Sequence, residues 1–245
     1  MLVKTKAIVL TSLKFGESDL IVKCFTEEGI KTYLLKRILK TINKKPNRSF
    51  RKLNTSYFQP LTQLNILANH NNKGTLNSIK EARISFLYQS ISTNVFKQAI
   101  AFFLAETLSY ALYEEEKNPR LFQYIETAFI WLDTHDRTAN FHLLFLLNLT
   151  KYLGFYPQLE NKNYDYFDLS EGHFINIKPK ANFIFGEKLI LFKSLIGINF
   201  DVIGKLQLNS KSRIIMLDIL LEYYELHLSG FRKPKSLSVL KEVFA

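Results

Sequence analysis

The chain has 245 residues, 47% of them hydrophobic, which is enough apolar side chain for one large buried core or two ordinary ones. The most apolar stretch, residues 141–149, is interrupted by a histidine and an asparagine and falls far short of the roughly 20 residues of a membrane-spanning helix. A single cysteine, Cys24, excludes an internal disulfide framework and a zinc site built from several cysteines. With no secretory signal at the N-terminus, we expect a globular protein of the cytoplasm.

The net positive charge lies entirely in the first third of the chain. Residues 1–80 contain 15 lysines and arginines against 4 acidic residues, whereas residues 81–245 contain 18 of each, so the total of +11 belongs to the first segment. This asymmetry predicts an N-terminal module that meets a polyanion, either nucleic acid or an anionic membrane surface, and a neutral body with another task.

Five β-type segments separated by turn signals make up that module. They are residues 7–11, 20–26 and 30–35, one or two strands within 53–70, and a last strand at 75–79. The turn at 27–29 ends in Gly29, which is free to take a positive φ in a tight hairpin. Five short strands with a long connection after the third fit the partly open barrel called the OB-fold better than a sandwich.

A basic run without acidic residues follows the third strand. Residues 36–52 hold eight lysines and arginines, and the centre, Lys45-Pro46-Asn47, predicts a loop. Aromatic residues lie among the cations, the mixture with which single-strand binders follow phosphates and stack on bases, although these rings are also candidates for the barrel core. The predicted DNA contacts are Lys36, Arg37, Lys40, Lys44, Lys45, Arg48, Arg51 and Lys52, with the strand lysines Lys6 and Lys31.

From about residue 81 the hydrophobic period becomes helical. Helices are predicted over 95–112, from Asn118-Pro119 onward, from Thr138 or Asn140 to Gly154, and over 189–196, 212–228 and 237–244. Residues 155–186 break this pattern with turn signals and two possible strands, 174–177 and 182–185. The expected organisation is α+β: an OB-fold domain at 1–80, a helical domain at 81–154 and 187–245, and a small insertion at 155–186.

No catalytic constellation is visible in the sequence. It lacks a phosphate-binding loop, a dinucleotide fingerprint and a nucleophile elbow, and its five histidines do not have the spacing of metal ligands. The acidic run 114–116 is explained more simply as a solvated helix end than as a magnesium site. The sequence therefore predicts a protein that is not an enzyme and has no cofactor, metal or catalytic residue.

Several short motifs occur in a characteristic order along the whole chain. They are Lys6-Ala7-Ile8-Val9-Leu10, Phe15-Gly16-Glu17-Ser18-Asp19, Phe25-Thr26-Glu27-Glu28-Gly29, Tyr152-Leu153-Gly154-Phe155-Tyr156-Pro157, Tyr223-Tyr224-Glu225-Leu226-His227-Leu228-Ser229-Gly230 and Lys235-Ser236-Leu237. Together they resemble the RecO family of bacterial recombination mediators. The resemblance implies an OB-fold domain, a helical domain and a zinc-ribbon-like insertion.

The resemblance also implies a function and partners. Members bind single- and double-stranded DNA, anneal complementary strands and, with RecR, help RecA to replace single-strand-binding protein. The expected partners are therefore DNA, RecR, single-strand-binding protein and, indirectly, RecA. The expected location is the nucleoid, and no membrane is expected as a partner. Two departures stand out. Residues 159–164 lack the cysteines that many members carry there, so packing rather than zinc should hold the insertion, and Lys36-Arg37 stands where the family tends to have Lys-Gly.

Two other functions remain open from the sequence. The first is a protein-interaction adaptor whose basic module docks an acidic protein tail. The second is an OB-fold protein that binds RNA.

Overall fold

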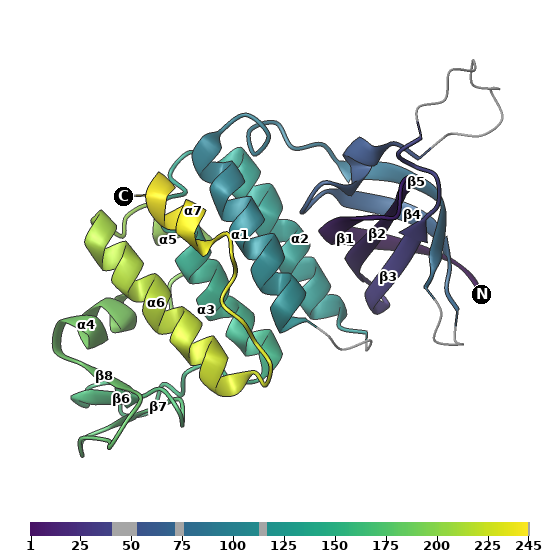
Figure 1. Cartoon of the computed structure of the whole chain (residues 1–245). Coiled ribbons are helices and arrows are strands. Elements are labelled where there is room, and N and C mark those ends of the chain that lie inside the picture. Colours follow the sequence, from purple (N-terminus) through teal and green to yellow (C-terminus); the bar gives the residue numbers. More distant parts are fainter. Residues whose placement is uncertain (41–52, 72–75, 113–116, 245) are drawn as a thin grey trace.

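The computed structural model describes residues 1–40, 53–71, 76–112 and 117–244. Figure 1 shows a β-barrel domain at one end, a layer of helices beside it, and a small second sheet at the end farthest from the barrel. The prediction of an α+β chain with an N-terminal barrel and a helical body is confirmed.

The N-terminal sheet has five antiparallel strands: β1 Leu2–Phe15, β2 Asp19–Thr26, β3 Gly29–Leu35, β4 Gln63–Asn69 and β5 Ser78–Phe86. A 3-10 helix, Thr55–Phe58, precedes β4. The strand order is β3-β2-β1-β4-β5, so β3 and β5 are the edges, and the sheet is not closed between them. A parallel bridge between Tyr33 and Asn77 brings the two edges together at one point, which gives the partly open barrel expected of an OB-fold.

Two strands differ from the predicted bounds. β1 begins at Leu2 instead of residue 7, and β5 continues to Phe86, so the helical period assigned from residue 81 is wrong for residues 81–86. The cause in β5 is that Ile79 is its only fully buried residue and its pairing with β4 shifts register twice, which erases the alternation that marks a strand.

The two faces of the first strands bury their side chains in different cores. Ala7 and Val9 of β1 point into the barrel, together with Cys24 of β2 and Tyr33 of β3. The neighbouring position Ile8, on the opposite face of β1, belongs to the core of the helical domain. Because successive strand residues alternate in direction, one strand contributes to both domains and joins them.

The helices are α1 Val95–Ala111, α2 Pro119–Thr134, α3 Phe141–Leu153, α4 Gly186–Leu195, α5 Phe200–Ile203, α6 Ser210–His227 and α7 Leu237–Val243. Asn118 caps α2 as predicted, its side chain accepting the Leu121 N–H at 3.0 Å. Asn140 stands at the N-cap position of α3, but its side chain bonds Leu206 and Arg213 instead of a cap N–H. The four-residue α5 was not predicted, and the acidic run 114–116 lies outside the described residues.

The insertion forms a three-stranded sheet of β6 Tyr166–Asp168, β7 His173–Ile175 and β8 Phe183–Phe185, in the order β7-β6-β8. Two of these strands match the predicted positions, and β6 was missed. The Phe167 ring is fully buried at 4.9 Å from Phe174, 4.8 Å from Phe192 of α4 and 6.0 Å from Tyr223 of α6 (centroid distances). Aromatic packing therefore holds this sheet against the helices.

The described residues contain neither a metal-binding cluster nor a membrane-spanning helix. No group of three or more His, Cys, Asp or Glu side chains there is placed to hold a metal ion. No helix in the same ranges is long and apolar enough to cross a membrane.

Candidate nucleic-acid interface

The described part of the basic run is Lys36, Arg37 and Lys40, and all three side chains are exposed directly after β3. The other predicted contacts of the run lie outside the described residues: Lys44, Lys45, Arg48, Arg51 and Lys52. The loop predicted around residues 45–47 lies outside them too.

The turn between β1 and β2 holds the start of this run in place. The carboxylate of Asp19 accepts the main-chain N–H of Arg37 at 2.7 Å, and the carbonyl of Ser18 accepts that of Leu39 at 2.9 Å. The turn itself depends on Gly16, whose φ of 58° lies in the left-handed region. The motif Phe15-Gly16-Glu17-Ser18-Asp19, which carried part of the family resemblance, thus fixes the position of the first cations of the run.

Arg37 has an unusual backbone. Its φ of 57° is left-handed, a conformation that costs most side chains about 1 kcal/mol and costs glycine little. The resemblance implies glycine at this position, and glycine adopts such a backbone without strain. The hydrogen bond that the Arg37 N–H donates to the charged Asp19 carboxylate offsets part of the strain, since such bonds contribute about 1.5–3 kcal/mol.

A groove of about 810 Å³ opens beside these residues, between the end of β3 and the start of β5. Its lining residues are Leu34, Leu35, Lys36, Arg37, Ile38, Leu53, Leu76, Asn77, Ser78 and Ile79. The groove is mainly aliphatic, and its two cations come from the basic run. Such a site suits a ligand with an apolar body and negative charge.

Lys31 lies near the same edge of the barrel, on β3. The His70 ring nitrogen Nε2 is 2.9 Å from the Tyr33 hydroxyl, and the N-terminal ammonium donates to the His70 carbonyl at 2.7 Å. Partial burial lowers the pKa of His70, the positive charges of Lys31 and the N-terminus lower that pKa further, and the negative charge of Glu28 raises it. Lys31 and the N-terminal ammonium therefore bring positive charge close to His70.

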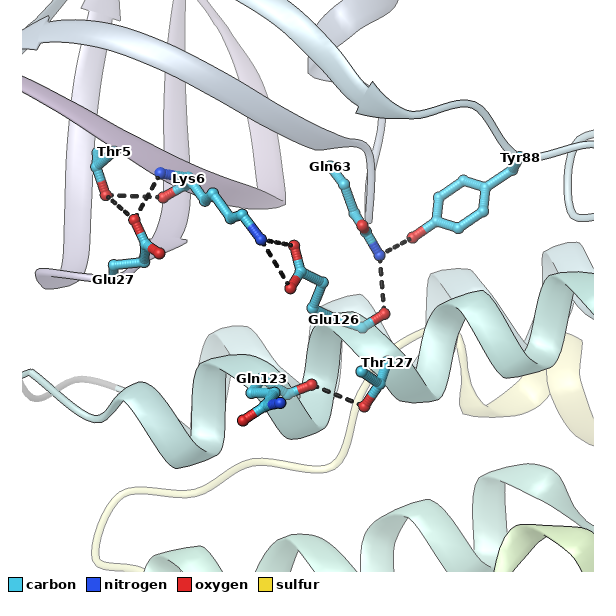
Figure 2. Close-up of polar contacts among 8 residues, drawn as sticks. All are labelled: Thr5, Lys6, Glu27, Gln63, Tyr88, Gln123, Glu126 and Thr127. Atoms are coloured by element: carbon cyan, nitrogen blue, oxygen red, sulfur yellow. Dashed lines mark hydrogen bonds and ion pairs between the residues drawn. The ribbon is translucent and has the colours of Figure 1, made fainter.

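Lys6 lies on the opposite side of the barrel, against the helices (Figure 2). Its ammonium is 2.9 Å and 3.1 Å from the two carboxylate oxygens of Glu126 on α2. The Lys6 N–H donates to Glu27 at 3.0 Å. The structure gives Lys6 a contact between the two domains, and its role in DNA binding stays a prediction.

Lys23 of β2 makes a second contact of this kind. Its ammonium donates to the carbonyls of Ser109 and Leu112, at 2.6 Å and 3.1 Å, where α1 ends. Burial lowers the pKa of Lys23, while the carbonyls at a helix C-terminus favour the positive charge. Lys6 and Lys23 therefore both join the barrel to the helical domain.

Gln63 and Glu126 complete the junction, and sequence reasoning missed both. The buried Gln63 side-chain amide donates to the Tyr88 hydroxyl and to the Glu126 carbonyl, each at 3.0 Å (Figure 2). Tyr88 in turn donates to the carbonyl of Leu61 at 3.1 Å. No local signal marks these residues, because their partners are far away in the sequence.

Comparison with known proteins agrees with this architecture over nearly all of the chain. The family model described as "Recombination protein O N terminal" matches residues 1–88, and "Recombination protein O C terminal" matches residues 92–237. A protein named "DNA repair protein RecO" from Christiangramia forsetii is 48% identical over 245 residues, and that from Flavobacterium psychrophilum is 46% identical over 246. The Bacteroides fragilis protein of that name is 36% identical over 248 residues, and all three alignments cover 100% of both chains. The chain therefore belongs to the RecO family, a family of DNA repair proteins.

Proposed function

We propose that this chain is a non-catalytic recombination mediator that acts at the nucleoid. It binds single- and double-stranded DNA, anneals complementary strands and, with RecR, helps RecA to replace single-strand-binding protein. The observation that carries the proposal is the placement of charge: all of the net +11 belongs to residues 1–80, and the described start of the acid-free run, residues 36–40, lies beside an open groove.

The physical basis is the release of counterions from DNA. Each lysine or arginine that neutralises a phosphate frees a condensed cation, which favours binding without regard to sequence. A surface of this kind holds two strands close together while their own charges repel each other, as annealing requires. The neutral helical body, fixed to the barrel by Lys6 and Lys23, then serves protein partners.

Strand annealing tests the proposal directly. Purified protein is mixed with complementary oligonucleotides, bare or coated with single-strand-binding protein, and duplex formation is followed by fluorescence. We expect faster annealing in both cases. No acceleration in either case would contradict the mediator function and favour a protein-interaction adaptor.

Charge reversal tests the role of the basic run. Changing Lys44, Lys45 and Arg48 to Glu should weaken binding of single-stranded DNA and reduce the slope of log affinity against log salt by about 2, because each phosphate contact contributes about 0.7. The matched control changes three exposed lysines of the neutral body to Glu: Lys180, Lys188 and Lys211. Equal affinity of the two folded triple variants would refute the assignment.

A ribose comparison addresses the remaining alternative. Oligoribonucleotides and oligodeoxyribonucleotides of one sequence present the same charge and differ at the 2′-hydroxyl. We expect no preference for the ribose form. A clear preference for it would favour the RNA-binding function.

A further inference from the structure

The strongest unassigned feature is the seam between the two edge strands of the barrel. Asn77 joins the edges: its N–H donates to the carbonyl of Thr32 at 3.1 Å, and its carbonyl accepts the Leu34 N–H at 2.8 Å. The Asn77 side-chain amide adds a bond to the same Thr32 carbonyl. Beyond this residue the strands separate, and the groove of about 810 Å³ lies between them.

The groove has an apolar floor and a cationic rim. Leu35 and Ile79 are buried in the barrel core and form its base, while Leu76 is 45% exposed at its side. Lys36 and Arg37 are exposed at the edge. Aliphatic surface beside cations suits a nucleotide, because the base has apolar faces and the adjoining phosphate is negative.

The backbone conformation of Arg37 indicates that its side chain has a role. Its left-handed backbone favours glycine, yet the chain carries arginine and stabilises the strained turn through Asp19. Within the described residues its guanidinium has no hydrogen bond or ion pair, so its planar face and five donors are available. A guanidinium plane is one of the groups on which unpaired bases stack.

One other face of the barrel is already occupied. The outward face of β1 and β2 is packed on the helices through Ile8, Leu10 and Phe25, and Lys23 is bound at the end of α1. The seam remains as an exposed, concave part of the barrel with cations on its rim.

We propose that this groove seats one unstacked nucleobase of single-stranded DNA, with Arg37 stacking on the base and Lys36 at the adjoining phosphate. The proposal rests on the proposed function and adds a subsite to it. A base in a duplex is already stacked and paired, so the groove favours single strands and unpaired ends over duplex.

Abasic oligonucleotides distinguish affinity that comes from a bound base from affinity that comes from phosphate contacts. Wild-type protein is titrated with a deoxythymidine oligonucleotide and with an abasic strand of equal length and charge. We expect about tenfold tighter binding of the strand with bases, the effect of one or two stacked bases. Arg37→Gly should reduce this preference to about twofold without loss of thermal stability, because glycine accepts the left-handed backbone.

Three further variants sharpen the test. Arg37→Lys keeps the charge without the plane and should lose the preference while retaining affinity for the abasic strand. Ser78→Leu places an aliphatic side chain at an exposed position of the groove, which should fill the site without offering a ring to stack on and should lose the preference too. Lys188→Ala removes an exposed lysine of α4 in the helical domain and should leave the preference unchanged.

The outcomes are distinguishable. Equal affinity of the wild-type protein for both strands would overturn the proposal that the groove binds a nucleobase. The mediator function, which is tested by annealing, would still stand. Retention of the tenfold preference in Arg37→Gly and in Ser78→Leu would also overturn the base seat. Failure to bind either strand would refute the base seat and the proposed function together.

Discussion

Truncation of Phe167 tests whether aromatic packing alone holds the insertion. This ring sits at the centre of the β7-β6-β8 sheet, is 0% exposed and contacts Phe174, Phe192 and Tyr223. Phe167→Ala removes the ring and leaves a cavity between the sheet and the helices. Phe185→Ala is the matched control, because it makes the same chemical change in the same sheet at a position that is 57% exposed.

The expected magnitudes follow from burial. Deleting a buried phenylalanine ring lowers the free energy of unfolding by about 3–5 kcal/mol, which for a chain of this length lowers Tm by roughly 6–20 °C. The exposed control should lose no more than about 1 kcal/mol. Because Phe167 belongs to the same buried cluster as the helices, the loss should be global and not confined to the insertion.

Thermal unfolding is followed by far-UV circular dichroism, and limited proteolysis reports on the insertion. Equal Tm values for the two variants would refute the reasoning. A wild-type Tm that falls on treatment with a chelator would refute it as well, because packing should hold the insertion without metal.

Other substitutions address charges at the junction and in the core. Lys6 is 43% exposed and Glu126 16%, so a double-mutant cycle of Lys6→Ala with Glu126→Gln should give a coupling of about 0.5–1 kcal/mol, and zero coupling would contradict the contact. Lys23→Met should lower the free energy of unfolding by about 1 kcal/mol by removing the charge at the end of α1, with Lys14→Met near neutral in the same denaturant titration. Burial lowers the pKa of His142 to about 3, so below its ordinary value near 6.5 the unfolded chain binds a proton that the folded chain does not. Stability should therefore fall as pH decreases from 6 to 4, by up to about 1.4 kcal/mol per pH unit, and His142→Leu should flatten that slope; an unchanged slope would contradict the assignment.

Features governed by neighbouring residues could be predicted from the sequence. Asn118 followed by Pro119 marks the start of α2 because a side-chain acceptor meets a free N–H three residues later. Gly154 ends α3 with a φ of 85°, a conformation that glycine adopts without strain. The three-strand meander followed from Gly29 and the alternation around it.

Features that depend on distant partners could not be predicted. Lys6 and Lys31 look alike in the sequence, yet the partner of Lys6 is on α2, 120 residues away. β5 shows no alternation, because most of its residues face solvent and its register shifts. The groove lies where the edge strands β3 and β5, which are far apart in the chain, do not pair. No sequence motif marks such a missing pairing.

The single cysteine, Cys24, allows opening of the barrel to be measured. Cys24 is 0% exposed among the side chains inside the sheet, and burial raises the pKa of its thiol, so thiol reagents reach it only when the strands separate. The rate of its modification in native buffer therefore measures how often the strands around Cys24 separate. A DNA strand bound at the seam should slow that reaction. The modification rate of Cys24 then reports occupancy of the groove without an engineered label.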